Sequence, residues 1–495
     1  MLMTNSNTTI YDCLIIGAGA AGLMCAAALA DHKLSAQAKT VSFSCLVLEG
    51  SKRVATKLLM SGGGQCNITH AGSIKDFVPC YGNNGKTIRN ALFKHSNLEV
   101  ITYLEKNGVP TVVRKDGGVF STSMRDVLYP HTAGGKDGKV FPASMRGADI
   151  KDLFIQKAEA AGFVIRCGEK VTAVTTRPSG QGTSAEERSN TSTMPSGQGL
   201  SAVTPFDYSG AVRLKDGGAA AAASLCDKAY TVATQAGNTY AARHLVIATG
   251  GCSYPPTGSD GSMFDVLARD LQIKVIRPIP ALTALAVTDY PFLELSGISF
   301  SDSTLTVTEA SGKVLAKERG PILLTEKDFS GPAVLNISKY AFMGEQRKLR
   351  INYLSLPYEE VLSRLTARLS GSKGSLANLM ADEFNLPKRF CQIMVARATG
   401  KAGSDPSPKA AARFLTEDAF LPMTDEATKT AAFKSAMATA GGVALIEINP
   451  KSFELRRWPG LYVIGEALDV DGATGGYNLQ FAWSSAQSAA DDIFS

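Results

Sequence analysis

The residues best suited to do chemistry form a glycine-rich turn near the N-terminus. Gly17-Ala18-Gly19-Ala20-Ala21-Gly22 follows the apolar run Asp12–Ile16 and precedes an alanine-rich stretch that reaches about Ala30. Glycines in this setting allow a tight turn, let backbone N–H groups approach a pyrophosphate, and let a helix pack closely with its positive end toward that group. The pattern predicts a strand, a turn and a helix that bind a dinucleotide.

An acidic residue ends the next predicted strand, Cys45–Glu49. A carboxylate at this position accepts a hydrogen bond from the adenosine ribose, which favours an unphosphorylated ribose, as in FAD or NAD. Glu49 lies farther from the glycine turn than the usual spacing of about 20 residues. We therefore expect a loop insertion between Asp31 and Ser44, and expect Glu49 to contact the nucleotide.

Two further glycine-rich segments could contact a flat ring. Ser61-Gly62-Gly63-Gly64-Gln65-Cys66-Asn67 offers backbone that can pack against a ring or a diphosphate, although a flexible loop is the alternative. Near the C-terminus, the predicted strand Leu461–Gly465 is followed by Glu466, and Gly475-Gly476 opens a helix from about Asn478. The start of that helix can place partial positive charge near a flavin pyrimidine, where negative charge accumulates on reduction.

These segments define the residues that we expect to bind the cofactor, which we take to be FAD. They are Gly17, Gly19, Ala20, Ala21, Gly22, Glu49, Gly50, Lys57, Ser61, Gly62, Gly63, Gly64, Cys66, Asn67, Val171, Ala248, Thr249, Gly250, Gly251, Gly465, Glu466, Asp469, Gly475, Gly476, Tyr477, Asn478, Leu479 and Gln480. Among them, Tyr477 and Gln480 are the favoured contacts of the flavin ring.

The order of these motifs resembles that of the aminoacetone-oxidase-like, or BaiN-like, family of FAD-binding flavoproteins, within the glutathione-reductase-type group. The resemblance covers nearly the whole chain. It rests on Gly17–Gly22, Lys57–Asn67, Val140-Phe141-Pro142, Ala248–Gly258, Ser330–Leu335 and Gly460–Gln480. Two departures occur: Gln65 stands where the family commonly has Arg, and Glu326-Lys327-Asp328 replaces the usual His-Phe-Gly. For this reason no particular substrate is carried over from the family.

The resemblance implies an α/β fold with a Rossmann-like FAD-binding domain, a central parallel sheet and a β-meander, interrupted by a β-rich domain and a helical domain. We expect the FAD-binding domain over 1–280 and 440–495, the β-rich substrate domain over 281–353 and 425–439, and the helical domain over 354–424. Residues 178–205 are rich in Ser, Thr, Gly and Gln. Few large apolar groups are present there to offset the ordering entropy, so we predict a disordered insertion.

Short strands are expected elsewhere. We predict a strand at Val171–Thr176, a hairpin that pairs Tyr230–Thr234 with Thr239–Ala242, and a separate buried strand at His244–Gly251. Residues 281–353 alternate short β-like runs with turns, and Tyr358–Lys434 is mostly helical.

Composition and charge limit the classes of partner that we expect for this chain. The net charge of +6 is spread over 495 residues without a basic run interleaved with aromatics, which disfavours nucleic acid. Cys13 to Ala30 is apolar but carries patterned glycines, so a buried strand and helix explain it better than a membrane span. Nine scattered cysteines without a C-x-x-C pair or metal-ligand spacing indicate reduced thiols in a cytoplasm and no metal. The oligomeric state stays open.

The expected activity is that of an FAD-dependent oxidoreductase. Hydride would pass between the flavin and a small organic substrate, such as an amine or aminoketone, or NAD(P)H, with oxygen or another acceptor reoxidising the ring. His70 and His131 are candidate proton donors, and Cys66 a candidate redox thiol, although a structural role is favoured for all three; the catalytic residues are left open. The alternatives are a non-catalytic flavin-binding regulator, an RNA-modifying flavoenzyme and a plain NAD dehydrogenase.

Overall fold

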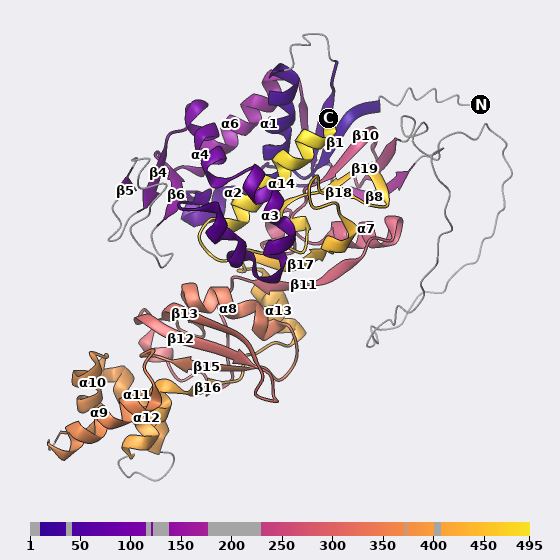
Figure 1. The fold of residues 1–495 in the computed structure, drawn as a ribbon. Helices are drawn as coiled ribbons and strands as arrows, with labels where there is room; N and C mark the ends of the chain where they lie inside the picture. The colour runs from indigo at the N-terminus through magenta and orange to yellow at the C-terminus, as the bar shows by residue number, and fades with distance from the viewer. Residues whose placement is uncertain are drawn as a thin grey trace, which may run out of the picture.

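The computed structural model describes residues 10–35, 42–114, 120–121, 138–176, 229–371, 374–399 and 407–495. The predicted insertion at 178–205 and the candidate His131 lie outside these residues. Within them, the chain forms two lobes stacked end to end (Figure 1), each with its own large hydrophobic core. The first and last described elements of the chain belong to the first lobe, whose core joins segments from the two halves of the sequence.

A parallel sheet forms the centre of the first lobe. Its strands follow the order β19-β10-β1-β2-β7, and each neighbouring pair is parallel. They are β1 (Ile10–Ile16), β2 (Cys45–Glu49), β7 (Val164–Cys167), β10 (Thr239–Ile247) and β19 (Trp458–Val463). The apolar runs predicted as the first two strands are buried along β2 and the second half of β1, as expected for strands with both faces covered.

Helices from the two ends of the chain cover one face of this sheet. α1 (Ala20–Ser35) packs against α14 (Tyr477–Ile493) and α6 (Gly147–Ala160). Figure 1 shows the yellow end of the chain beside its indigo beginning. Alanines are buried on both α1 and α14, and their small side chains allow the two helix axes to approach closely. This packing brings the first and last sequence motifs to one end of the sheet.

An antiparallel extension adds β8 (Val171–Thr176) and β9 (Tyr230–Thr234), and α7 (Ser262–Leu271) packs on β8. The predicted pairing of Tyr230–Thr234 with Thr239–Ala242 is confirmed. The separate strand predicted at His244–Gly251 is wrong, because β10 runs unbroken to Ile247. One strand serves both purposes: its first half pairs with β9, and its second half pairs with β1 and β19.

Smaller elements flank the first lobe. A four-stranded sheet has the order β3-β6-β4-β5, with β3 (Thr69–His70), β4 (Thr111–Arg114), β5 (Phe120–Ser121) and β6 (Lys139–Pro142). The helices beside it are α2 (Thr56–Met60), α3 (Gly85–Lys94) and α4 (Asn97–Lys106). The short strand β18 (Glu454–Leu455) pairs with β19.

The second lobe is built on a five-stranded antiparallel sheet of order β14-β13-β12-β15-β16. Its strands are β12 (Ser299–Thr308), β13 (Val314–Leu324), β14 (Phe329–Ser330), β15 (Lys348–Asn352) and β16 (Asp418–Phe420). The predicted helical segment forms α9 (Tyr358–Ser370), α10 (Leu376–Phe384), α11 (Lys388–Thr399), α12 (Pro408–Thr416) and α13 (Glu426–Phe433). Apolar side chains of α9–α12 join those of the sheet in one core.

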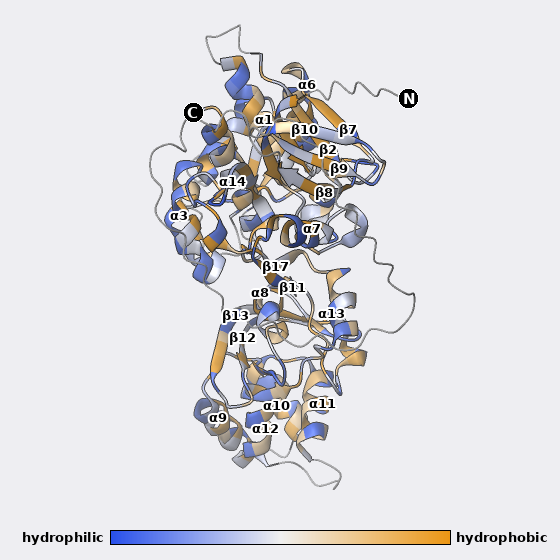
Figure 2. Cartoon of the chain, turned by 90° about the vertical axis from the view of Figure 1, so that its right-hand side faces the viewer, coloured by the Kyte–Doolittle hydropathy of each residue, from blue (hydrophilic) through white to orange (hydrophobic). Residues whose placement is uncertain are grey.

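A helix that the alternating pattern did not predict, α8 (Pro332–Phe342), lies between the lobes. It packs on β12 and β13 below and on β11 (Val275–Ala281) above. β11 pairs with β17 (Ala438–Val443), and these two strands carry the chain between the lobes (Figure 2). The Lys339 ammonium on α8 forms an ion pair with Asp471 at 2.7 Å, which ties the second lobe to the first.

Among the helices of the described ranges, none has the length and apolarity required to cross a lipid bilayer.

Candidate cofactor site

A cavity of about 900 Å³ lies at the carboxyl ends of the parallel strands. Residues that follow β1, β2, β10 and β19 line it, together with the start of α14 and residues of the second lobe. Ligands of open α/β sheets bind at this edge, where the loops leave the strands. The strand order therefore positions the predicted motifs around one space.

The three glycines of the turn after β1 differ in the space available for a side chain. Gly17 has φ +102°, and a Cβ there would lie 2.5 Å from the Ala248 oxygen. A Cβ on Gly22 would lie 1.9 Å from the Gly17 oxygen, so Gly22 lets α1 fold back on the turn. Gly19 lines the cavity, and a Cβ there would meet nothing within 4 Å. Gly17 and Gly22 thus serve the fold, and Gly19 leaves open space at the start of α1.

Glu49 is fixed at the end of β2. Its carboxylate accepts hydrogen bonds from the backbone N–H groups of Ala18 and Ser51, both at 2.8 Å. The side chain is buried and lines the cavity, and a Cβ on Gly258 would lie 3.3 Å from its Oε1. The loop around Gly258 therefore closes this end of the cavity, which we call the nucleotide end.

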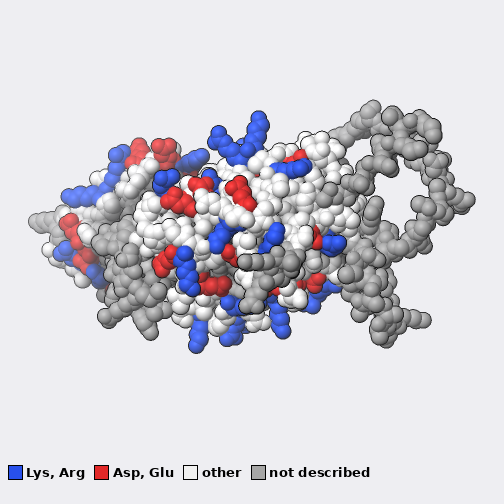
Figure 3. Space-filling model, turned by 90° about the horizontal axis from the view of Figure 1, so that it is seen from above, with Lys and Arg blue, Asp and Glu red and all other residues white. Residues whose placement is uncertain are grey.

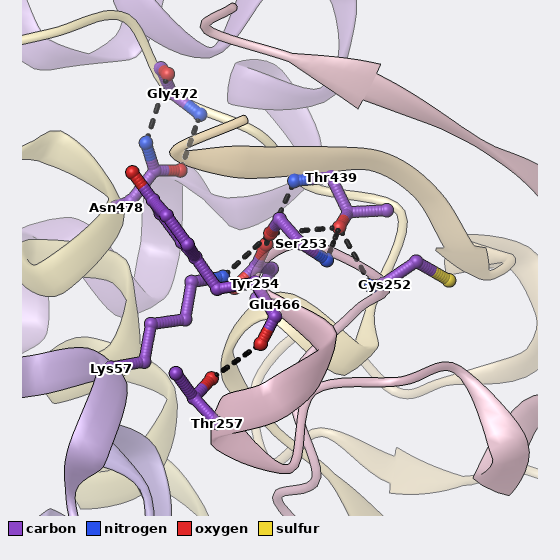
Figure 4. A network of polar contacts seen from close by, with 9 residues as sticks. All are labelled: Lys57, Cys252, Ser253, Tyr254, Thr257, Thr439, Glu466, Gly472 and Asn478. Atoms are coloured by element: carbon purple, nitrogen blue, oxygen red, sulfur yellow. Dashed lines mark hydrogen bonds and ion pairs between the residues drawn. The ribbon is translucent and has the colours of Figure 1, made fainter. Parts of the chain in front are cut away.

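A polar network lies beside the cavity where the lobes meet (Figure 4). The Lys57 ammonium on α2 donates to Glu466 Oε2 at 2.5 Å and to Ser253 Oγ at 2.7 Å. Glu466 Oε1 accepts from Ser253 Oγ at 2.9 Å and from the Thr439 N–H on β17 at 2.7 Å. The network joins the loops after β10 and β19 to the strand that leads into the second lobe.

The opposite end of the cavity, which we call the ring end, is built from backbone. Gly62 and Gly63 have φ +58° and +68°, conformations that favour glycine. Gly476, just before α14, has φ +97°, and a Cβ there would lie 2.6 Å from the Thr69 carbonyl carbon. Gly475, Gly476, Asn478 and Leu479 line the cavity, so the positive end of the α14 dipole faces it.

Buried polar atoms test whether a flavin dinucleotide suits this cavity. Asn67 Oδ1, Thr249 Oγ1 and Ser259 Oγ are buried without a hydrogen-bond partner among the described residues. All three residues line the cavity. Leaving such atoms unpaired costs about 1–3 kcal/mol each, so a polar ligand that pairs with them would be stabilised. Together with the open space at Gly19, these atoms fit a bound FAD.

Most of the predicted residues line the cavity; their contact with FAD stays a prediction. Those that line it are Gly17, Gly19, Ala20, Ala21, Glu49, Gly50, Lys57, Ser61, Gly62, Gly63, Asn67, Val171, Ala248, Thr249, Gly250, Glu466, Gly475, Gly476, Asn478 and Leu479. Those that do not are Gly22, Gly64, Cys66, Gly251, Gly465, Asp469, Tyr477 and Gln480.

The two favoured ring contacts turn away from the cavity. Gln480 is fully buried; its Nε2 donates to the His95 carbonyl oxygen and its Oε1 accepts from Thr69 Oγ1. The Tyr477 ring stacks on His70 with centroids 5.4 Å apart, and burial raises the pKa of its hydroxyl far above the ordinary value. Positions three apart share a helix face, and this face of α14 packs inward.

The remaining residues outside the lining have packing roles. Cys66 is fully buried, and burial raises the pKa of its thiol to about 12, so it is not a reactive thiolate. A Cβ on Gly251 would lie 2.4 Å from Thr439 Oγ1, and one on Gly465 would lie 2.7 Å from the Ala21 Cβ. Asp469 Oδ1 accepts a hydrogen bond from the Gly441 N–H on β17 at 3.0 Å.

Several cavity residues were missed in the sequence. They include Ser51, Ala55, Met60, Lys139, Lys170, the loop 254–263, Leu282, Pro332, Leu335 and Met437. Lys139 directly precedes the Val140-Phe141-Pro142 motif, and residues 254–258 belong to another quoted motif, so proximity to a motif was a usable signal for these. Pro332 and Leu335 lie within the quoted motif Ser330–Leu335 and could have been found in the same way, whereas Leu282 and Met437 lie next to no quoted motif.

Comparisons with known proteins show which family the chain resembles along most of its length. The family model described as "HI0933-like protein Rossmann domain" matches residues 11–130 and 212–492. A ribosomal RNA dihydrouridine synthase of Haemophilus influenzae is 27% identical over 492 residues, covering 97% of this chain and 98% of the relative. A 3-dehydro-bile acid delta(4,6)-reductase of Clostridium scindens is 24% identical over 482 residues, covering 95% and 96%.

Among solved structures, a 3-ketosteroid delta1-dehydrogenase from Sterolibacterium denitrificans matches with a TM-score of 0.45 and 11% identity. The match covers 98% of this chain and all of that chain.

Proposed function

Because the chain belongs to the HI0933-like family of FAD-binding Rossmann proteins and is an FAD-dependent oxidoreductase, we propose that it reduces a carbon–carbon double bond conjugated to a carbonyl group. A bound flavin stores two electrons and supplies them as a hydride. We assign the glycine turn, Glu49 and the loop 254–263 to the nucleotide half of FAD. We assign residues 61–67 and the start of α14 to its ring.

The observation that carries this proposal is the change in lining at the ring end. Here the Thr474 N–H, next to Gly475, donates to Asn336 on α8 at 2.9 Å. The lining includes apolar side chains of the second lobe and of the strands that connect the lobes, namely Leu282, Pro332, Leu335 and Met437. Apolar walls with a few polar groups are typical of sites for flat organic molecules. They also exclude water from the place where a hydride would be transferred.

The names of the relatives support reduction as the direction of the reaction. Dihydrouridine synthase and delta(4,6)-reductase both describe the addition of hydrogen to a double bond. NADH or NADPH is the electron donor that we propose. Amines and aminoketones, the substrates suggested by the sequence resemblance, would run the flavin in the opposite direction as electron donors.

We propose a small molecule as the substrate. Lys and Arg side chains on the face seen in Figure 3 are interspersed with Asp and Glu, and a nucleic-acid surface is typically a continuous basic stripe. A uracil ring in ribosomal RNA is the second candidate, because the Haemophilus relative of that name aligns over nearly its full length. Both substrates would present a double bond next to a carbonyl.

An anaerobic reoxidation assay tests the proposal. The holoprotein is reduced chemically and mixed with a cyclic enone, a 4,6-dien-3-one steroid, or an unmodified ribosomal RNA fragment, and the return of the oxidised flavin absorbance is followed. We expect reoxidation by at least one enone, with a product two hydrogens heavier by mass spectrometry. If only the RNA reoxidises the flavin, the substrate is a uracil ring in RNA and not a small molecule. If none of the three reoxidises the flavin while amines or aminoketones bleach it, the proposed reaction is wrong.

A further inference from the structure

Three lysines of the described chain line the cavity, and they differ in their partners. Lys57 pairs with Glu466 at 2.5 Å, and Lys170 pairs with Asp260 at 2.6 Å. Within the described ranges, Lys139 has no carboxylate at ion-pair distance. The other two ammonium groups are therefore already neutralised by the protein, whereas the Lys139 ammonium is paired with no carboxylate of the described residues.

Lys139 lies at the ring end of the cavity. It is the first residue of β6, and its Cα partner on β3 is His70, whose ring stacks on Tyr477 at the start of α14. Two residues further along β6, the Phe141 ring lies 3.5 Å from the position that a Cβ on Gly62 would occupy. The strand thus places Lys139 among the glycine loop and the start of α14. The apolar residues of the second lobe belong to the same cavity.

The surroundings of Lys139 disfavour a bare ammonium. Partial burial removes water from it, and together with the positive charge of Arg114 this lowers the pKa of Lys139 below its ordinary value. A partly desolvated cation without a counter-ion is costly, and an anionic oxygen within hydrogen-bond distance would offset that cost. Among the described residues, the cavity therefore offers one lysine ammonium that is not paired with a carboxylate, in a lining that also contains apolar side chains.

From this arrangement we infer that Lys139 holds the carbonyl oxygen of the substrate; this inference rests on the proposed function. In the reduction, a hydride supplied by the reduced flavin would bond to one carbon of the double bond, and a proton from water would bond to the other. Between these two events the electron pair of the broken π bond resides on the carbonyl oxygen. The Lys139 ammonium donates a hydrogen bond to that oxygen as its negative charge develops. The substrate class is then a flat, largely apolar molecule with one carbonyl at its end.

The test uses binding to the oxidised holoprotein and requires no turnover. The probes are benzoate and benzamide, which have the same shape and differ in charge, and their dissociation constants are measured by calorimetry. We expect the protein to prefer benzoate, and Lys139→Met to reduce that preference by about 10- to 100-fold, as expected for a hydrogen bond to a charged group. Lys139→Arg should retain most of the preference. Lys348→Met, at the exposed first residue of β15 in the second lobe, is the matched control and should change nothing.

Two further measurements separate this inference from its alternatives. Flavin content, read from the visible absorbance, should be the same in all variants; if Lys139→Met loses flavin, Lys139→Gln replaces it. An unchanged benzoate preference in the neutral variants would overturn the inference. If the flavin reduction potential shifts while the benzoate preference stays unchanged, Lys139 acts on the flavin ring and not on the substrate. Loss of the preference in a protein that reduces no enone would uphold the binding role and reject the proposed reaction alone.

Discussion

Adding one methyl group at either of two glycines should separate cofactor binding from folding. Gly19 lines the cavity, and a Cβ there meets nothing within 4 Å, whereas a Cβ on Gly22 would lie 1.9 Å from the Gly17 oxygen. Gly19→Ala therefore places its methyl group in the space assigned to the FAD diphosphate. Gly22→Ala drives its methyl group into the backbone of the turn.

The magnitudes follow from these positions. Gly19 directly precedes α1, where exchanging glycine for alanine costs about 1 kcal/mol or less of stability. We expect FAD affinity to fall by about 10- to 100-fold, equivalent to about 1.4–2.8 kcal/mol. For Gly22→Ala, overpacking costs about 1–3 kcal/mol, and a clash with backbone that cannot rotate away places it at the upper end or above.

Two assays measure the two effects. Urea denaturation of the flavin-free protein gives the free energy of unfolding, and the quenching of flavin fluorescence on binding gives the FAD dissociation constant. We expect a stable Gly19→Ala protein that binds FAD weakly, and a Gly22→Ala protein that is already unstable without FAD. This expectation is refuted if Gly19→Ala binds FAD like the unmodified protein, or if both variants lose equal stability.

Two other predictions concern an ion pair beside the cavity and a buried histidine of the first lobe. Lys57→Met removes one partner of Glu466. Because the pair is partly exposed, we expect the free energy of unfolding, measured by urea denaturation, to fall by only about 1–2 kcal/mol. The double variant Lys57→Met/Glu466→Gln should recover part of this loss, and no recovery would mean that the two residues are not coupled. Burial lowers the pKa of His95, but hydrogen bonds to Asp491 and Glu99 outweigh this, and the net pKa is raised. The His95 contribution is therefore fully present below the unfolded-state pKa of about 6.5 and is lost as the pH rises through the folded value. The melting-temperature difference between the protein and His95→Asn should shrink with rising pH over this window, and a constant difference would contradict it.

The sequence predicted best the elements whose local residue pattern is compatible with only one structure. The buried strand Cys45–Glu49 and the turn Gly17–Gly22 combine an apolar run with glycines in a fixed order, and the structure has both. The unbroken β10 was missed because Arg243 interrupts the apolar run; its side chain is exposed and bonds to Asp12, so the strand continues past it.

Details of the cavity depended on tertiary contacts. The sequence placed Tyr477 and Gln480 at the start of a helix, but the face that α14 turns toward the cavity is fixed by its packing on α1 and β3. Periodicity groups 478, 479 and 482 on one side and 477, 480 and 481 on the other, without saying which side is inward. Leu335 and Met437 reach the cavity only because the second lobe folds against the first.

We propose that one FAD is held jointly by the opening glycine turn and the start of the last helix. Hydrogen–deuterium exchange of the protein with and without FAD tests this directly, since amides that face the cofactor become protected. If one FAD contacts both segments, FAD should protect the peptides that contain 17–22 and also those that contain 475–479. Protection limited to one of these segments, with the other exchanging as in the flavin-free protein, would contradict this proposal.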